Sequence, residues 1–473
     1  MESNNTIEMT KIKFGTDGWR AIIAQEYTTD NVARVAYATA QWIKNTSDNH
    51  SAVVGYDCRF AGKLFTETTI SVFINEGIKV YTSEGFVSTP MVSLSTLKHK
   101  AYAGIVITAS HNPPSYNGFK IKAHYGGPAI QDEIDAVEIL IPESHQVKIL
   151  SMEELKKSHL VEIIDMEQEY IDHVEANFDI EAIKNSGIKF GYDAMYGAGQ
   201  NVIRRLLPDT YLMHAEYNPS FMGQAPEPIA RNLKPFAEHI RNSDISCGLA
   251  TDGDADRIGL FDENGDFVDS HHIILLLIRY LVEMKGVKGN VYTSFSCTSK
   301  IKTLCDHYGL ENTVTKIGFK YICKEMIEND ALLGGEESGG IAVSTHIPER
   351  DGIWMGLILW EYMAKTGKTL SELIQEVYEI TGSFAMDRYD LHVPEEQKLA
   401  IIQMCNSKDY AQFGDYTVTG HETIDGFKFL LNDDNWVMIR PSGTEPILRV
   451  YAQAPTSEEV IRILDATKAT ITT

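Results

Sequence analysis

The sequence has few cysteines, and none of them is placed to form a conventional metal or disulfide motif. Six cysteines are scattered over 473 residues, and no two of them stand in a Cys-x-x-Cys pair. This spacing argues against a disulfide framework and against a thiolate zinc site. We therefore interpret the cysteines as reduced residues that fill space in the fold.

Long hydrophobic runs are also missing. The longest uncharged apolar stretch, Gly352 to Trp360, falls far short of the ~20 residues that a bilayer requires. The first residues, Met1 to Asn5, are polar, and no apolar segment of the kind found in secretion signals follows them. The sequence therefore predicts a cytoplasmic protein that does not associate with membranes.

Positive charge is scarce relative to negative charge. Against 42 Lys and Arg stand 66 Asp and Glu, which gives a formal net charge of −24. Such a chain repels a polyanion unless its basic residues gather on one face, and the sequence contains no basic run. Nucleic acid is therefore not expected as a partner. The hydrophobic fraction of 43% is that of an ordinary folded protein.

The chain is too long for one hydrophobic core, and its pattern repeats. Short β-branched runs alternate with helical patterns over the first three-quarters, which is typical of α/β units with a buried parallel sheet. Two runs carry the same Gly-Tyr-Asp, ending at Asp57 and Asp193, and a more divergent run opens at Gly289. We therefore expect three repeated α/β domains.

Each repeat contains a second apolar strand that ends in an unusual loop. The three strand-loop pairs are 104–107 into 108–112, 247–250 into 252–256, and 331–333 into 335–339. Ligands on open α/β sheets gather at the carboxyl ends of the strands. We expect mixed sheets whose loops face one central cleft.

The last part of the chain has a different pattern. A helix is expected near 395–405, strands at 427–431, 435–439 and 447–453, and a final helix opened by the capping box of Thr456 and Glu459. This predicts a small α+β domain. The resulting domain boundaries are 1–150, 151–265, 266–383 and 384–473.

Asp252, Asp254 and Asp256 alternate along the chain. In an extended segment all three carboxylates project to one side, where they can bind a hard cation. The spacing also matches a calcium EF-hand, but position six is Arg257 instead of glycine and the preceding segment is a strand. We reject the EF-hand; a solvated acidic loop is the simpler alternative, although three crowded acids repel one another without a cation.

Ser110 follows a strand in the segment Ser-His-Asn-Pro-Pro. The two prolines prevent the chain from continuing as helix or strand, so the hydroxyl is well presented for covalent chemistry. The alternative is that Ser110 makes only a local turn and that His111 is an ordinary polar loop residue. For Lys120, taken alone, a surface lysine is the default interpretation.

Two further loops have polar groups suited to a sugar phosphate. In the segment 440–446, Arg440 is followed by serine, glycine and threonine, which can offer charge, hydroxyls and N–H groups to an anion, or form a simple turn. The segment 335–340 is either a carboxylate-bearing sugar clamp or a glycine-rich loop.

Together these loops resemble those of the α-D-phosphohexomutase family. The resemblance rests on four signatures in the family's order, and it extends from Phe14-Gly-Thr-Asp-Gly-Trp-Arg20 to the last domain. The signatures are Thr108-Ala-Ser-His-Asn-Pro-Pro114, Asp252-Gly-Asp-Ala-Asp-Arg257, Gly335-Glu-Glu-Ser-Gly339 and Arg440-Pro-Ser-Gly-Thr444. The resemblance implies four domains, each contributing one loop to a central cleft.

The resemblance also implies a role for each site residue. Ser110 would carry the phosphoryl group, and its phosphate with Asp252, Asp254 and Asp256 would hold Mg²⁺. Sugar hydroxyls would be bound by Glu336 and Ser338, and the distal phosphate by Arg440, Ser442, Gly443 and Thr444. The transfer site would be lined by Arg20, His111, Lys120, Arg257, Lys320 and Arg449.

The implied reaction interconverts hexose 1-phosphate and hexose 6-phosphate through a bound glucose 1,6-bisphosphate. Several relatives have histidine after the sugar loop, but this chain has Gly340, so the general acid/base role moves to Lys320 or Lys120. The loop at Glu336 is closer to the glucose type, which favours glucose phosphate with some mannose phosphate. A phosphoglucosamine mutase, a metal-dependent phosphomonoesterase and a non-enzymatic sensor are the alternatives, and a monomer and a homodimer are equally compatible.

Overall fold

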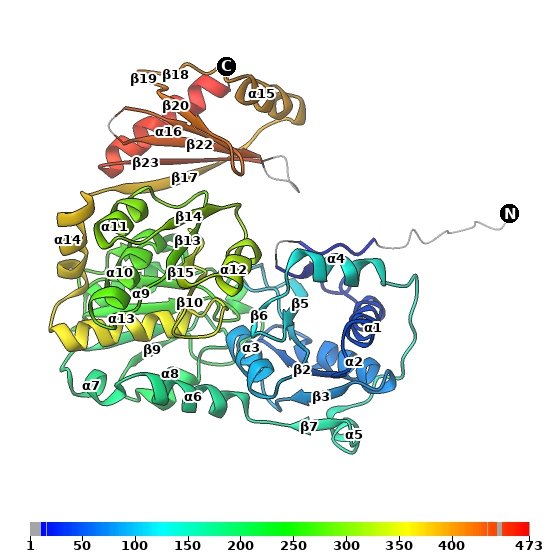
Figure 1. Ribbon diagram of the computed structural model, residues 1–473. Helices are drawn as coiled ribbons and strands as arrows, with labels where there is room; N and C mark the ends of the chain where they lie inside the picture. Colours follow the sequence, from blue (N-terminus) through cyan, green and yellow to red (C-terminus); the bar gives the residue numbers. More distant parts are fainter. Residues whose placement is uncertain (1–10, 16, 433, 442–446, 473) are drawn as a thin grey trace. The chain divides into compact units, whose positions relative to one another are not determined.

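The computed structural model describes residues 11–15, 17–432, 434–441 and 447–472 (Figure 1). Its chain divides into two compact units. The first comprises Met1–Lys288 and Gly318–Leu373, and the second comprises Gly289–Ile317 and Ile374–Thr473. We describe each unit by itself.

The first unit begins with a seven-stranded mixed sheet. Its strand order is β1-β5-β4-β2-β3-β7, and β6 pairs with β5. The strands are β1 (Trp19–Ile22), β2 (Ser51–Tyr56), β3 (Lys79–Thr82), β4 (Ala103–Ile107), β5 (Tyr116–Ala123), β6 (Gly127–Pro128) and β7 (Val161–Ile163). The β-branched and apolar residues of β2 and β4 are buried, as expected of parallel strands with covered faces.

Helices accompany this sheet. They are α1 (Thr29–Thr46), α2 (Gly62–Asn75), α3 (Thr89–Lys98), α4 (Gln131–Ile139) and α5 (Met152–Leu155). The side chain of Thr28 accepts a hydrogen bond from Asn31 N and thereby fixes the start of α1. Residues of the helices and of the sheet share one hydrophobic core, which includes Val35, Val54 and Ile105.

A second sheet in the same unit repeats the arrangement of the first. Its order is β12-β11-β10-β8-β9. The elements are α6 (Met166–Asn177), α7 (Ile180–Asn185), β8 (Phe190–Asp193), α8 (Val202–Leu206), β9 (Tyr211–Met213), α9 (Lys234–Arg241), β10 (Cys247–Thr251), β11 (Ile258–Phe261) and β12 (Phe267–Val268). As with β2 and β4, the Gly-Tyr-Asp strand β8 lies parallel to β10, which precedes the second polar loop.

The rest of the first unit packs largely apolar helices beside a short antiparallel pair. Its elements are α10 (Ser270–Glu283), α12 (Phe319–Glu328), β15 (Ala331–Gly335), β16 (Ile341–Val343) and α13 (Gly352–Thr366). The longest apolar run of the sequence lies in α13 and is buried. Among the described helices, none is long and apolar enough to cross a membrane.

The second unit contains the parallel pair β13 (Asn290–Ser294) and β14 (Asn312–Thr315) with α11 (Lys300–Tyr308). The helix α14 (Leu370–Thr381) carries the chain from the first unit into the second. A five-stranded sheet of order β17-β23-β22-β21-β20 follows, together with a separate two-stranded sheet. These elements are β17 (Ala385–His392), α15 (Glu395–Ser407), β18 (Gln412–Phe413), β19 (Tyr416–Thr417), β20 (Gly420–Glu422), β21 (Phe427–Leu430), β22 (Trp436–Pro441), β23 (Ile447–Ala454) and α16 (Ser457–Ile471).

The predicted α/β class with mixed sheets is confirmed, and the α+β character of the last part agrees with the observed elements. The three expected strands and two expected helices of that part are present, but β17, β18, β19 and β20 were not predicted. Strand β17 contains three charged residues, Asp387, Arg388 and Asp390, and none of its residues is fully buried, so its sequence has no buried-strand signal. Thr456 caps α16 as expected, through a bond from Glu459 N.

Candidate active site

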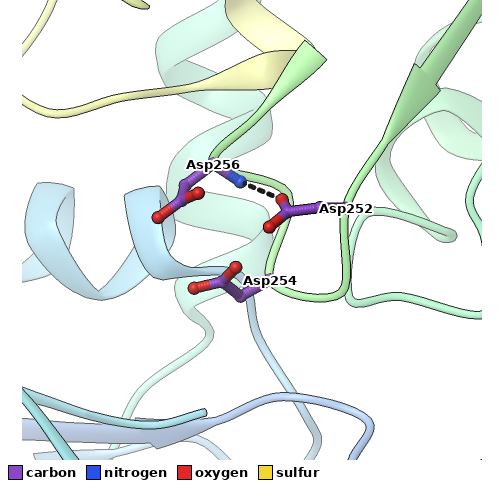
Figure 2. A group of neighbouring side chains, drawn as sticks. All are labelled: Asp252, Asp254 and Asp256. Atoms are coloured by element: carbon purple, nitrogen blue, oxygen red, sulfur yellow. Dashed lines mark hydrogen bonds between the residues drawn. The ribbon is translucent and has the colours of Figure 1, made fainter. Parts of the chain in front are cut away.

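The three aspartates that follow β10 lie in a tight turn (Figure 2). Ala255 N donates to Asp252 O at 3.1 Å, and Ala255 has a φ of 58°. Asp252 Oδ1 accepts from Asp256 N at 2.9 Å, and the three carboxylates each offer an oxygen within 4.8 Å of the others. The expectation of an extended segment was therefore wrong: the backbone turn, and not the alternation of side chains, brings the carboxylates together.

Lys120 lies at the centre of this acidic cluster. Its Nζ is 2.8 Å from carboxylate oxygens of Asp17, Asp254 and Asp256, and its side chain is fully buried. The default interpretation of Lys120 as a surface lysine is therefore wrong. Burial alone would lower the pKa of Lys120, but the three carboxylates outweigh it and raise that pKa above its ordinary value.

Arg350 provides a second buried cation that the sequence did not indicate. It donates to Asp17 Oδ2 and, at 2.7 Å, to Asp256 Oδ2. A side-chain Cβ at Gly340 would lie 2.5 Å from Arg350 Cδ, so the arginine occupies the space beside this glycine. Although burial raises it, the pKa of Asp17 is held well below its usual value by Arg350 and Lys120.

The oxygens left over by these contacts suit a hard cation. Asp254 Oδ1 and Asp256 Oδ1 are buried and have no hydrogen-bond partner, while Lys120 and Arg350 hold the other oxygens of these carboxylates. Buried polar atoms without partners are rare and require an explanation. Burial and the neighbouring charges of Asp254 and Asp256 raise the pKa of Asp252 well above its usual value, and a bound divalent ion would remove this penalty. The donor set fits Mg²⁺.

Ser110 adjoins the aspartate turn. Its Oγ donates to Asp252 Oδ2 at 2.6 Å and lies 3.4 Å from Nδ1 of His111. Its backbone has a φ of 52°, in the left-handed region that non-glycine residues seldom adopt. A Cβ at Gly253 would lie 2.5 Å from the carbonyl oxygen of Ser110, so only glycine at position 253 permits this approach of the two loops.

The other predicted residues of the transfer site lie around these loops. Arg20 Nη1 donates to Asn112 Oδ1 at 2.8 Å, and Arg257 N donates to Asp252 Oδ1 at 3.1 Å. Burial first, and then the charges of Arg257 and Arg20, lower the pKa of His111 well below its ordinary value. His111 is therefore neutral at physiological pH.

The glycine-rich segment at 335–340 adjoins the aspartate turn. Ile258 N donates to Gly339 O at 3.1 Å, and Gly339 N donates to Glu336 O. Glu336 Oε1 accepts from Gly318 N at 2.8 Å. Burial, together with the charge of Glu337, raises the pKa of Glu336 to about 7. Ser338 is half-buried in the same turn.

Lys320 lies in a different environment from Lys120. It is half-buried near the start of α12, and its Nζ donates to Gln131 Oε1. Burial lowers the pKa of Lys320, the opposite of the shift at Lys120. The surroundings of the two candidate lysines therefore shift their pKa values in opposite directions.

In the second unit, Arg440 and Arg449 are paired directly across β22 and β23. Like charges opposite each other destabilise a sheet unless anions compensate them. Arg440 contacts Asp425 at 3.3 Å, and Arg449 lies 4.0 Å from Asp390. The predicted ligands Ser442, Gly443 and Thr444 lie outside the described residues.

Sequence reasoning missed three residues of the first unit: the partly buried Asp17 and the buried Arg59 and Arg350. Each is isolated in sequence from the loop that it contacts. Asp17 lies inside the recognised segment Phe14–Arg20 and Arg59 lies just after Gly-Tyr-Asp57, and these positions were the available signal. Arg350 follows a loop with no such motif.

Comparison with known families matches each part of the chain to a different domain of one family. Four descriptions match, all named phosphoglucomutase/phosphomannomutase: alpha/beta/alpha domains I, II and III, and the C-terminal domain. They cover residues 11–148, 168–265, 269–380 and 391–469.

Individual relatives agree with this result. A phosphoglucomutase/phosphomannomutase of Thermococcus kodakarensis is 30% identical, with 96% of each chain covered. A phosphoglucosamine mutase of an Exiguobacterium species is also 30% identical over 96% of each chain. A crystal structure from Thermus thermophilus, described as a phosphomannomutase, superimposes with a TM-score of 0.86 at 32% identity, covering 98% of this chain and all of the other.

Proposed function

The chain belongs to the phosphoglucomutase/phosphomannomutase family of phosphohexomutases, which are isomerases, and we propose that it carries the transferred phosphoryl group on Ser110. One observation carries this proposal. Ser110 Oγ lies 2.6 Å from Asp252 Oδ2, beside carboxylate oxygens that have no partner. A phosphate on this hydroxyl would bring its oxygens to a cation held by the same turn.

The proposed transfer exchanges one P–O bond for another. The bond from phosphorus to Ser110 Oγ breaks, and a bond from phosphorus to the free hydroxyl oxygen of a hexose phosphate forms. The proton of that hydroxyl passes to a base of the protein, and Oγ takes up a proton as it leaves. The hexose 1,6-bisphosphate then reorients in the site, and the reverse steps return its other phosphoryl group to Ser110.

Asp252, Asp254 and Asp256, with an oxygen of the Ser110 phosphate, would hold Mg²⁺. When bound there, Mg²⁺ would neutralise charge that develops on the transferring phosphoryl group. Lys120 and Arg350 support this role because they pair with Asp254 Oδ2 and Asp256 Oδ2 without occupying Asp254 Oδ1 or Asp256 Oδ1.

We propose Lys320 as the base and Lys120 as a fixed charge partner. The support is the direction of the pKa shifts, since a lysine of lowered pKa is unprotonated in a larger fraction near neutral pH and is then available to act as a base. Lys320→Arg keeps the charge but cannot act as a base, so it should lower kcat while leaving KM nearly unchanged. Full turnover of Lys320→Arg would move the role to another residue.

Other residues would hold the two ends of the substrate. Arg20, His111 and Arg257 would surround the reacting phosphate. At the distal phosphate we propose Arg440 and Arg449, supported by their position on adjacent strands, together with Ser442, Gly443 and Thr444 of the loop between these strands.

For the sugar, we propose glucose phosphates as preferred substrates, with mannose phosphates used less well and glucosamine phosphates poorly. An ionised Glu336 accepts hydrogen bonds from two neighbouring hydroxyls, and Ser338 provides one more. Contacts at the 3- and 4-hydroxyls do not separate glucose from mannose, which differ at the 2-position.

A phosphoglucosamine mutase is the second candidate. It is favoured by the relatives of that name and by the additional carboxylate of Glu337, which would attract an ammonium group if it faced the sugar. Comparing kcat/KM for glucose, mannose and glucosamine 1-phosphates decides between them. A clear preference for glucosamine 1-phosphate would overturn the choice of glucose.

The same assay tests the phosphomonoesterase alternative, because phosphate release is monitored in parallel. A mutase forms hexose 6-phosphate with little free phosphate, whereas a phosphatase releases phosphate in step with substrate loss. We further propose that the enzyme is cytoplasmic and acts as a monomer or homodimer. Sedimentation analysis would establish which of these two oligomeric states it has.

A further inference from the structure

Arg59 is a buried arginine that contacts the backbone of the Ser110 loop at four points. It follows β2 and is 1% exposed. Its Nη1 donates to the carbonyl oxygens of Pro113 at 2.9 Å and Tyr116 at 3.1 Å. Its Nη2 donates to those of Ser110 and Asn112, both at 2.6 Å. One rigid, planar group therefore spans the whole loop.

Asp57 supports this arrangement from the other side. Arg59 Nε lies 3.4 Å from Asp57 Oδ2, and Asp57 Oδ1 accepts from Arg59 N at 2.9 Å. Asp57 Oδ2 also accepts from Thr108 Oγ1 at 2.5 Å, and that hydroxyl oxygen accepts from Ser110 N at 2.9 Å. Both the N–H and the carbonyl of Ser110 are thus fixed by the Asp57–Arg59 pair.

These contacts explain how Ser110 keeps an unusual backbone conformation. A left-handed φ of 52° is strained for serine and persists only where the surroundings over-determine it. The bonds from Arg59 and Thr108 hold the peptide groups on both sides of Ser110. As a result its Oγ points at Asp252.

The four terminal N–H groups of Arg59 are already occupied, which separates its role from that of a phosphate ligand. Four carbonyl oxygens accept from Nη1 and Nη2, while the buried Nε makes no hydrogen bond and lies 3.4 Å from Asp57 Oδ2. A guanidinium used in this way has no free Nη–H group for an anion. By contrast, Arg257 and Arg20 lie beside the loop and are only partly buried.

We propose that Arg59 is a positioning residue for phosphoryl transfer, which fixes the Ser110 loop so that Oγ meets the aspartate turn. This inference rests on the proposed role of Ser110. Because Arg59 acts through the backbone of the loop, its loss should slow the transfer steps and leave substrate binding almost unchanged.

Arg59→Lys tests this proposal. Lysine keeps the charge beside Asp57 but has three donors on one nitrogen and cannot bridge four carbonyl oxygens. We expect kcat to fall about 100-fold, the loss typical of a small misplacement of a reacting group. The rate at which glucose 1,6-bisphosphate phosphorylates Ser110, followed by intact mass, should fall by the same factor, with the KM for hexose 1-phosphate within about twofold of wild type.

Two further variants keep the test decisive. Val35→Ala removes buried methyl groups from α1, away from the loop, and serves as the control for loss of stability. If it lowers the melting temperature as much as Arg59→Lys does and also lowers kcat as much, the positioning role is refuted. Should Arg59→Lys fail to fold, the double variant Asp57→Asn/Arg59→Met removes both charges together, and the same loss of kcat is expected from it.

The failure of this inference is distinguishable from failure of the proposed function. Wild-type kcat in a folded Arg59→Lys enzyme whose Ser110 is phosphorylated would overturn the positioning role alone. Sustained activity of Ser110→Ala would instead overturn the phosphoserine mechanism, whatever Arg59→Lys does.

Discussion

The first two sheets use the same short motif in two different ways. Gly-Tyr-Asp57 ends at the tip of β2, and Gly-Tyr-Asp193 ends β8; both aspartates are buried. Asp57 is paired with the buried Arg59 and, through Thr108, holds the Ser110 loop. Asp193 instead accepts from Met195 N at 2.8 Å and contacts His214 at 3.0 Å.

The difference shows how one repeated framework gives two kinds of chemistry. In each sheet the strand parallel to the motif strand leads into a polar loop, but only in the first loop does a buried cation beside the motif aspartate, Arg59, bind the backbone carbonyl oxygens. The second loop, the aspartate turn, is closed by its own backbone bonds. In the proposed mechanism, the first sheet would therefore present a fixed nucleophile, and the second would present carboxylates for a metal.

The sharpest way to break this comparison is to remove the nucleophile. Ser110→Ala should lower kcat about 10⁴-fold or more, because the proposed transfer passes through a phosphate on the Ser110 hydroxyl. Its melting temperature should stay close to that of wild type, since the hydroxyl contributes little packing. Intact-mass measurement should find phosphate on wild type and none on the variant; activity at the wild-type level would refute the assignment.

The second loop is tested by Asp254→Asn, in which a neutral amide replaces a carboxylate ligand. We expect turnover to fall about 100-fold, because the amide binds a hard cation less well and neutralises less charge. Asp244→Asn, which replaces an exposed carboxylate that lies just before β10 and pairs with Lys189, is the control. If chelator-treated wild type turned over as fast as the Mg²⁺-supplemented enzyme, the metal assignment would be wrong.

The two repeated aspartates can be compared directly through stability. Asp57→Asn leaves the buried Arg59 without its counter-charge and should cost about 3 kcal/mol. Asp193→Asn keeps part of its hydrogen bonding and loses a half-exposed partner, so about 1 kcal/mol is expected. Calorimetric melting of both variants shows which substitution costs more stability. An equal loss of stability would show that Asp57 and Asp193 stabilise their repeats equally.

The smallest effect concerns pH. The pKa of Glu336 is raised to about 7, and only the ionised carboxylate accepts two hydrogen bonds from the sugar. We therefore expect kcat/KM to rise about tenfold between pH 6 and 8. Glu336→Gln should flatten this part of the profile, and an unchanged profile would exclude Glu336 as its cause.

Stability should move in the opposite direction with pH. Because the folded-state pKa of Glu336 lies above its ordinary value of 4.5, the stability linked to this group is complete below about pH 4.5 and is lost as the pH rises through about 7. The difference in melting temperature between wild type and Glu336→Gln should follow this course.

The sequence predicted the fold class and the loops because these depend on local signals. Buried strands such as β4 and β10 are apolar runs, and the aspartates are adjacent in sequence. The prediction that an extended segment brings the three carboxylates together was wrong, because a turn depends on hydrogen bonds of the backbone that residue spacing does not reveal.

The surroundings of Lys120 could not be predicted from the sequence for a different reason. Its partners Asp17, Asp254 and Asp256 come from distant parts of the chain, and no local pattern indicates that a lysine will be buried among them. Arg350 was missed for the same reason, although the absence of a side chain at Gly340 is readable in the sequence. The predicted domain boundaries and site roles stay predictions that the variants above would test.

The buried cysteines have a practical consequence. All six cysteines are buried and none is in a disulfide, and burial raises the pKa of Cys247, Cys305 and Cys405 to about 12. A thiol-specific reagent should therefore label the native protein slowly, and only when a segment opens. Because the cysteines are spread from Cys58 to Cys405, peptide mapping of the label would rank the opening rates of successive domains without any engineered probe.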